Sequence, residues 1–272
     1  MSKNKQLKIA LDAGHGYKTP GKRTPDGERE WYFNDIVLRA CEKELRTYKN
    51  VSILRLDDST GKTDVPLKTR TKKANDWKAD LLVSIHHNAY LSKWGEWSGV
   101  ETYVYKRNSV AENIANLVNP KIVKAMGLRN RGVLTKNLHM IRESQMPAIL
   151  TEGGFMDSLI DIKSLRDKQK LNNQGIGIAT GIAEYYKLTK LNGEKNKGEL
   201  TMSQYNELKK EIENLKNVKL KGTQKKDMFN LLKFAYVSNI FTVDHSQNID
   251  KLTKDEALDL LISFNGRYHL KK

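Results

Sequence analysis

IALDAGHGYKTPGKRTPDGEREWYFN, residues 9–34, joins an apolar run to a loop rich in Gly, Pro, Lys and Arg and then to a periodic segment. The apolar run at 8–13 predicts a buried strand, and the periodic segment at 30–48 predicts a helix. His15 follows the carboxyl end of this strand, where open α/β sheets present their ligand sites. The loop therefore raises two alternatives, a metal site at His15 and a phosphate site at Lys22.

The phosphate alternative fails on the sequence itself. GYKTPGKR, residues 16–23, differs from the phosphate-binding pattern G-x-x-x-x-G-K-[ST] in its last residue. Such a site needs Ser or Thr after the Lys to hold Mg²⁺, and a helix whose N-terminus faces the phosphates. Arg23 stands at the Ser/Thr position, and the turn signal TPDG at 24–27 stands where the helix would begin. The metal alternative at His15 is the one that remains.

Apolar runs alternate with helical periodicity over most of the chain before residue 190. Almost continuous apolar runs separated by helices are typical of a mainly parallel sheet covered on both faces. We therefore expect one α/β domain over residues 1–189. The expected strands lie at 8–13, 51–56, 80–86, 99–105, 138–142 and 147–152, and the expected helices at 30–48, 65–78, 109–126 and 170–188.

The composition changes after residue 189. Residues 190–201 hold Gly, Lys and Asn and little that could be buried, which predicts a linker. Residues 202–272 predict a small, mostly helical domain, with helices at 202–217, 225–237 and 253–264. An internal translation start at Met202 would produce this domain as a separate piece.

Charge and hydropathy limit the possible partners and compartments. The formal net charge is +16 at pH 7, and most of the excess lies before residue 191. Such basicity is typical of proteins that meet polyanions, namely nucleic acid, anionic lipid or anionic wall polymers. No run approaches the roughly 18 consecutive apolar residues of a membrane span, and the N-terminus lacks the apolar core of a secretion signal. We expect synthesis in a cytoplasm, no membrane insertion, and no disulfide within the chain, because Cys41 is the single cysteine.

Glu30 opens the helix that is predicted to follow the loop. It shares one helix face with Asn34, Val37 and Cys41, at i, i+4, i+7 and i+11, and this face should pack on the sheet. A carboxylate in this place either caps the helix dipole or binds something inside the protein.

Further polar residues lie at the carboxyl ends of two predicted strands. His86 and His87 end the strand at 80–86; adjacent strand residues point to opposite faces, so one is a candidate ligand and the other packs or lies at the surface. Glu152 ends the run PAILTE, where an acid is costly to bury unless it is paired or used. Two histidines and one carboxylate bind Zn²⁺ with a fourth position open for water, and a second carboxylate can then transfer a proton. With His15 and Glu30, these residues indicate one site for metal-assisted hydrolysis.

Several motifs together resemble a known family. ALDAGHG, Glu30 with Asn34 four residues on, RTKKANDWKADLLVSIHHNA, GVETYVY, NRGV and MPAILTEGGF resemble, in order and spacing, the zinc-dependent N-acetylmuramoyl-L-alanine amidases of bacterial wall turnover and phage lysis. The resemblance covers about residues 7–188 and implies a twisted mixed sheet flanked by helices. It also implies cleavage of the amide bond between N-acetylmuramic acid and the L-alanine of the stem peptide.

The resemblance assigns roles residue by residue. It implies that His15, Glu30 and His86 hold Zn²⁺, that His87 occupies a variable position, and that Glu152 is the catalytic acid and base. Ala13 departs from the family, whose members usually have Pro there, but it corresponds to no ligand.

The order of the predicted parts resembles that of phage or prophage endolysins, in which a catalytic domain is joined by a linker to a small C-terminal domain. This implies a protein held in the host cytoplasm until release, which then lyses the Gram-positive wall. The partners implied are peptidoglycan and anionic wall polymers, with residues 202–272 binding the wall or mediating oligomerisation.

Two alternatives stay open on the sequence. A zinc peptidase that cuts within the stem peptide could use the same residues. A non-enzymatic protein could use its basic charge on nucleic acid, but no recognition helix, finger spacing or aromatic-basic RNA motif supports that partner.

Overall fold

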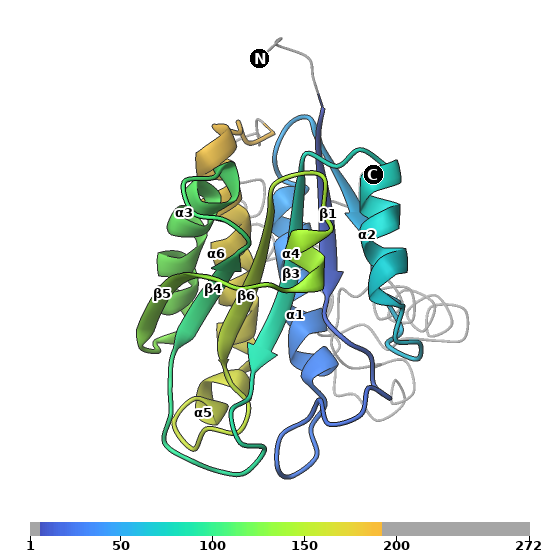
Figure 1. The fold of residues 1–272 in the computed structure, drawn as a ribbon. Coiled ribbons are helices and arrows are strands. Elements are labelled where there is room, and N and C mark those ends of the chain that lie inside the picture. The colour runs from blue at the N-terminus through green and yellow to red at the C-terminus, as the bar shows by residue number, and fades with distance from the viewer. Residues whose placement is uncertain (1–5, 192–272) are drawn as a thin grey trace, which may run out of the picture. The chain divides into compact units, whose positions relative to one another are not determined.

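Six strands form one sheet in the order β2-β1-β3-β6-β4-β5 in the computed structural model, which describes residues 6–191 (Figure 1). β1 pairs in parallel with β2 and β3, and β3 with β6, whereas β4 pairs antiparallel with β6 and parallel with β5. The predicted mixed, mainly parallel sheet is therefore confirmed. The strands are β1 Leu7–Ala13, β2 Val51–Arg55, β3 Leu81–Asn88, β4 Val100–Val104, β5 Asn130–Thr135 and β6 Ala148–Phe155.

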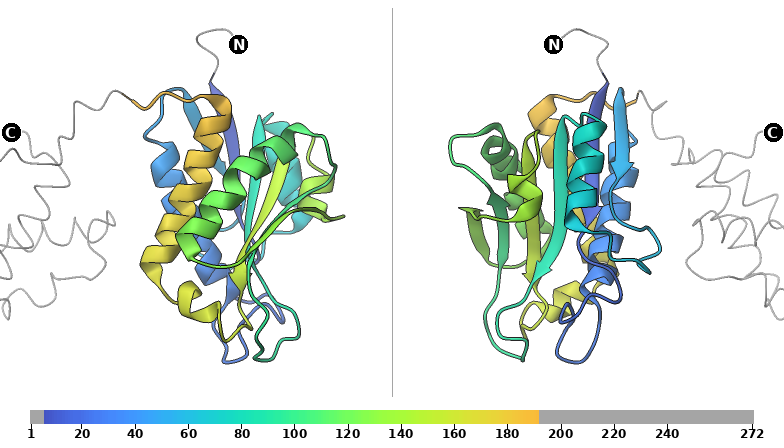
Figure 2. Two further views of the ribbon diagram at one scale, coloured as in Figure 1. Left: turned by 90° about the vertical axis from the view of Figure 1, so that its left-hand side faces the viewer. Right: turned by 45° about the vertical axis from the view of Figure 1, so that its right-hand side comes forward.

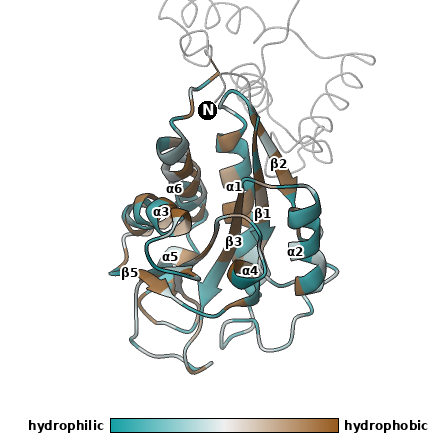
Figure 3. Ribbon diagram, turned by 45° about the horizontal axis from the view of Figure 1, so that its top comes forward, coloured by the Kyte–Doolittle hydropathy of each residue, from teal (hydrophilic) through white to brown (hydrophobic). Residues whose placement is uncertain are grey.

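Helices cover both faces of the sheet (Figure 2). α1, α3 and α6 pack on one face, where the larger apolar core lies, and α2 and α4 cover the other face over a smaller core. Figure 3 shows α2 as hydrophilic along most of its length, which fits a helix with one narrow buried side. The helices are α1 Glu30–Leu45, α2 Leu67–Asp76, α3 Val110–Met126, α4 His139–Arg142, α5 Ile162–Leu165 and α6 Lys168–Tyr186.

The close approach of α1 to α6 fixes where α1 begins over the sheet. At Gly175 of α6, an added Cβ would lie 2.3 Å from the carbonyl oxygen of Val37 on α1, so only glycine fits between the two helices. The buried side of α1 continues from Val37 back to Glu30, as the sequence predicted. α1, whose first residue is Glu30, thereby begins near the carboxyl ends of β1 and β3 (Figure 1).

One predicted strand is wrong. Residues 138–142 form no strand; His139–Arg142 is the short helix α4, and β5 lies earlier, at Asn130–Thr135. Met140 and Ile141 are neighbours and are both buried against the smaller core, which a strand with alternating faces does not allow. β5 was missed because it is an edge strand with exposed polar residues and Gly132 in place of an apolar run.

No helix in the described part of the chain, residues 6–191, is long and apolar enough to cross a membrane. The predicted linker beyond Leu191 and the predicted helical domain at 202–272 lie outside the described residues, and both stay predictions.

Candidate metal centre

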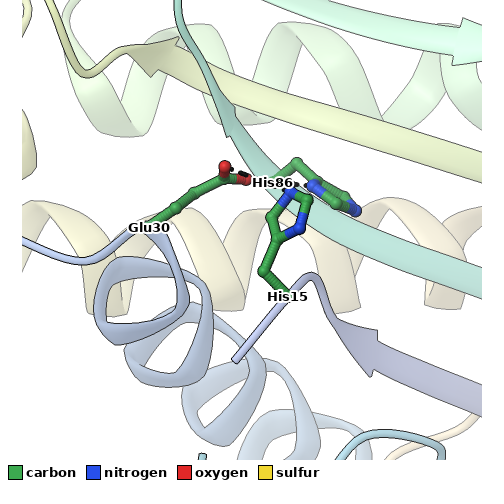
Figure 4. Close-up of side chains that lie close together, drawn as sticks. All are labelled: His15, Glu30 and His86. Atoms are coloured by element: carbon green, nitrogen blue, oxygen red, sulfur yellow. Dashed lines mark hydrogen bonds and ion pairs between the residues drawn. The ribbon is translucent and has the colours of Figure 1, made fainter. Parts of the chain in front are cut away.

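Three side chains from different parts of the sequence converge at the carboxyl edge of β1 and β3. His15 follows β1, Glu30 begins α1 and His86 lies near the end of β3, and one ligand atom of each lies within 4.8 Å of the others (Figure 4). Glu30 Oε2 is 3.2 Å from His15 Nε2, and Glu30 Oε1 is 2.9 Å from His86 Nδ1. These three predicted residues therefore form one cluster.

Glu30 is held in place by Asn34 and by the two histidines of the cluster. Its side chain is buried, and Asn34, one turn along α1, donates to the carbonyl of Gly14 at 3.1 Å and to Glu30 Oε1 at 3.3 Å. Burial alone would raise the pKa of Glu30, but hydrogen bonds and charge from His15 and His86 outweigh it and hold this pKa well below its ordinary value. Glu30 is therefore a carboxylate, which is the form that binds a cation.

His15 has a backbone conformation that few residues with a side chain adopt. Its φ angle is +67°, in the left-handed region, which costs on the order of 1–3 kcal/mol for a residue other than glycine. The buried guanidinium of Arg70 stabilises this turn, because it donates to the carbonyls of His15 and Ala13, each at 2.9 Å. The conformation aims the imidazole at Glu30.

His86 is oriented by a buried chain of hydrogen bonds. Arg70 pairs with Asp12 at 2.7 Å, Asp12 accepts the hydroxyl hydrogen of Ser84 at 2.6 Å, and Ser84 Oγ is 3.1 Å from His86 Nε2. Because the Ser84 hydroxyl donates to Asp12, its oxygen accepts from Nε2, and Nδ1 of His86 faces Glu30. Histidines that bind metals are usually oriented in this way through their second nitrogen.

The space beside the cluster suits a small ligand. A cavity of about 260 Å³ is lined by His15, His86 and the first turn of α2. At Gly14, which also lines it, an added Cβ would lie 2.0 Å from the imidazole of His86, so a side chain here would displace that ring. Two imidazole nitrogens and one carboxylate oxygen, open to a cavity on one side, are the donor set of a catalytic zinc site.

His87 belongs to the core and not to the cluster, in line with the prediction that only one histidine of the pair at 86 and 87 is a candidate ligand. It is buried between Asn34 and Gln174, with Nδ1 2.8 Å from Asn34 Oδ1 and Nε2 3.2 Å from Gln174 Oε1. Burial lowers the pKa of His87 to about 4, so this side chain is neutral near pH 7.

Glu152 lies on the same face of the sheet as His86. The two residues are register partners on the parallel strands β6 and β3, and Glu101 on β4 is the partner of Glu152 on its other side. Side chains of register partners point to the same face of a sheet. Glu152 therefore lies in a row of three polar residues across neighbouring strands.

The carboxyl group of Glu152 is poorly solvated. Its Oε2 is buried and has no hydrogen-bond partner in residues 6–191. Burial, together with the negative charges of Glu30 and Glu101, raises the pKa of Glu152 to about 8, against the lowering effect of His86. A carboxyl group with this environment can exchange a proton near neutral pH.

Sequence reasoning missed the residues that support the cluster, chiefly Asp12, Ser84 and Arg70, and also Glu101. Glu101 accepts hydrogen bonds from Asn88 at 3.1 Å and from Tyr103 and Arg131. A signal was present for Asp12, because it interrupts an otherwise apolar strand. Its partner Arg70, 58 positions away, is not indicated by any local pattern.

The fold and the cluster together define a class, an open α/β domain with a candidate His-Glu-His metal centre at the carboxyl edge of its sheet. Comparison with protein families identifies the group within this class: residues 9–184 match the family model described as Amidase_3, N-acetylmuramoyl-L-alanine amidase. The chain belongs to this family, and the resemblance seen in its sequence is confirmed.

Individual relatives agree with the family model. The chain is 34% identical over 187 residues to the N-acetylmuramoyl-L-alanine amidase CwlM of Bacillus licheniformis, covering 68% of this chain and 70% of that protein. It is 35% identical over 196 residues to an endolysin of Bacillus phage SPP1, covering 68% of each. Among solved structures, the catalytic domain of the amidase CwlV from Bacillus (Paenibacillus) polymyxa var. colistinus matches with a TM-score of 0.62 at 32% identity, over 68% of this chain and 100% of that one.

Proposed function

We propose that the chain is a zinc-dependent N-acetylmuramoyl-L-alanine amidase in which His15, Glu30 and His86 hold the metal and Glu152 is the acid and base. The family membership already makes it an amidase that hydrolyses peptidoglycan between N-acetylmuramic acid and L-alanine. The observation that carries the finer proposal is the convergence of the three ligand atoms at the carboxyl ends of β1 and β3, with Glu152 as the register partner of His86.

The donor set fits Zn²⁺, and the surrounding residues fit the reaction. When bound, the ion would polarise the amide carbonyl and lower the pKa of the attacking water. Glu152 takes a proton from that water at its carboxylate and returns it to the nitrogen of L-alanine, so that the amine leaves uncharged. A nearby cation would also lower the pKa of Glu152 from about 8 and favour the form that accepts a proton.

The experiment that tests the assignment is a digest of purified peptidoglycan by the full chain. An amidase exposes new L-alanine amino groups and leaves the lactyl carboxyl on the sugar. The alternative zinc peptidase would leave the muramoyl-alanine bond intact and expose ends within the stem peptide. Mapping the new ends by mass spectrometry separates the two activities.

We also propose that the protein lyses Gram-positive walls as an endolysin, with the region beyond residue 201 binding wall polymers or mediating oligomerisation. The similarity to the phage SPP1 endolysin supports the first part. The positive charge supports attraction to anionic wall polymers. The turbidity of Gram-positive wall suspensions should fall after addition of the protein. The family membership favours this enzymatic role over the alternative role of a nucleic-acid-binding protein.

The hydrogen-bond chain behind His86 gives a prediction for metal affinity. Ser84→Ala removes the acceptor of His86 Nε2 and leaves Asp12 with one partner fewer. Loss of such a supporting residue typically weakens metal binding about 10- to 100-fold. Titration of Zn²⁺ against a competing chromophoric chelator measures this, and Ser52→Ala on β2 is a control that should not change the affinity. Equal affinity in Ser84→Ala and wild type would contradict the orienting role.

A further inference from the structure

A second cavity, of about 400 Å³, lies between α2 and α4. Its α2 side includes Lys68, Thr71, Lys72 and Asn75, which are spaced i, i+3, i+4, i+7 and so form one stripe along the helix, and also Asp76 at the end of α2. Its other side includes His139 and Arg142 of α4 and the two residues Glu143 and Gln145 that follow it. We name this cavity the α2–α4 groove; Figure 1 shows the two helices on the same face of the sheet.

The groove adjoins the candidate metal centre through α2. Leu67 and Arg70, in the first turn of α2, line the cavity that contains His15 and His86. Lys68, between them in sequence, lines the groove, which therefore starts next to the metal centre and follows α2 away from it. From Lys68 to Asn75 the helix rises about 10 Å, at ~1.5 Å per residue, which is the length of about three residues of extended peptide.

Charges are distributed unequally along the groove. Lys72 pairs with Asp76 at 2.5 Å and Arg142 pairs with Glu143 at 2.6 Å, whereas Lys68 has no carboxylate within ion-pair distance among residues 6–191. Asp76 ends α2 and so stands at the far end. Glu143, whose pKa is lowered chiefly by its hydrogen bond with Arg142 and also by the charge of Lys68, lies within electrostatic reach of Lys68. Along α2 the groove thus runs from the cation Lys68, near the metal centre, to the carboxylate of Asp76 at the far end.

His139 adds a hydrogen-bond acceptor to the groove. Its Nε2 is 3.2 Å from Thr71 Oγ1, and the Thr71 hydroxyl donates to the carbonyl of Leu67 or Lys68. Because that hydrogen is engaged, Thr71 Oγ1 accepts from Nε2, and Nδ1 of His139 keeps a free lone pair. A peptide N–H group can donate to it.

We propose that the α2–α4 groove binds the stem peptide beyond L-alanine, with Lys68 binding the free carboxylate of the residue that follows. This inference rests on the proposed function. In bacterial stem peptides that residue is a glutamate linked through its side chain, which leaves its α-carboxylate free or amidated, and a diamino acid comes next. The order of charges in the substrate, an acid and then an amine, is complementary to Lys68 followed by Asp76 along α2.

The test compares three soluble substrates: N-acetylmuramoyl-L-alanine, the muramoyl dipeptide with a free α-carboxylate on its second residue, and the same dipeptide as the carboxamide. The full chain should cleave the carboxylate form with a kcat/KM about 10-fold above that of the carboxamide, through a lower KM at equal kcat. Lys68→Gln should remove this preference. The control Lys73→Gln makes the same change of charge on the side of α2 that faces β2, where Lys73 donates to the carbonyl of Arg55 at 2.7 Å, and it should keep the preference.

Binding to a full-length Glu152→Gln protein, measured by calorimetry, separates the two proposals. Suppose that the wild-type chain cleaves none of the substrates, but the carboxylate dipeptide binds more tightly than the carboxamide and Lys68→Gln removes this difference. The proposed function then fails and the groove proposal stands. If cleavage occurs and Lys68→Gln keeps the preference, or if the two dipeptides bind equally, the groove proposal is overturned. Matching unfolding curves for Lys68→Gln and Lys73→Gln ensure that a lost preference reflects binding.

Discussion

Glu152→Gln is expected to lower the kcat of amide hydrolysis by about 10³-fold, within the range of about 10²- to 10⁴-fold typical of a general acid and base. The amide of glutamine has nearly the shape of the carboxyl group but neither accepts nor returns a proton. Glu152 is not one of the three clustered ligands, so the substitution should leave metal content unchanged. The expected result is an intact protein with normal metal binding and almost no turnover.

The measurement is the initial rate of release of L-alanine amino groups from purified peptidoglycan, together with metal analysis of the same sample. Glu184→Gln is the matched control, because Glu184 is an exposed carboxylate in a surface ion pair with Lys121 on the far side of the sheet from Glu152. Full activity in Glu152→Gln would remove Glu152 from the mechanism. If Glu152→Gln lost metal together with activity, Glu152 would act by supporting the metal centre and not by transferring a proton.

The same variant should change how stability depends on pH in the metal-free protein. The pKa of Glu152 is raised from 4.5 to about 8 in the folded state, so this state holds the proton more tightly than the unfolded chain does. The contribution of Glu152 to stability is fully present below pH 4.5 and is lost as pH rises toward 8. Denaturant unfolding at several pH values should show wild type losing stability relative to Glu152→Gln over this window, and a constant difference between them would contradict the raised pKa.

The sequence predicted the candidate site better than it predicted the whole sheet. His15 and one histidine of the pair at 86 and 87 were identified because polar residues at the ends of apolar strands need a reason. The resemblance to the amidase family selected His86, and the structure brings it together with His15 and Glu30. The position of Glu30 followed from its helix face, since Val37 and Cys41 on the same face are buried. Their proposed roles as ligands, and that of Glu152 as acid and base, remain for experiment.

What the sequence could not predict depends on contacts between distant residues. The left-handed conformation of His15 is stabilised by Arg70 from α2, 55 positions away, so local propensity gives no indication of it. The edge strand β5 gains its order from pairing with β4, and its own polar sequence does not specify a strand. The strand at 138–142 was predicted wrongly for a different reason. An apolar run this short fits either a strand or a buried helical turn.

Removal of the metal is expected to abolish activity without unfolding the protein. Glu30 keeps both imidazoles as partners when no cation is bound, at 3.2 Å from His15 and 2.9 Å from His86, so the buried carboxylate stays hydrogen-bonded. Dialysis against a chelator should therefore leave the circular dichroism spectrum unchanged while hydrolysis of peptidoglycan falls below detection. One equivalent of Zn²⁺ per chain should restore the rate, and binding should raise the unfolding midpoint because the ion binds the folded state preferentially.

Two variants identify the site of the metal in that experiment. His86→Asn should hold less than about one tenth of an equivalent of Zn²⁺, whereas Glu184→Gln, which changes a carboxylate outside the cluster, should hold the full equivalent. If His86→Asn kept its metal, the ion would have to bind elsewhere. If the chelated wild-type protein kept its full rate with as little metal as His86→Asn, the metal would have at most a structural role at the cluster. We expect activity to be lost only in His86→Asn and in the chelated wild-type protein, and Zn²⁺ to restore it only in the chelated wild type. This result would place the metal at His15, Glu30 and His86.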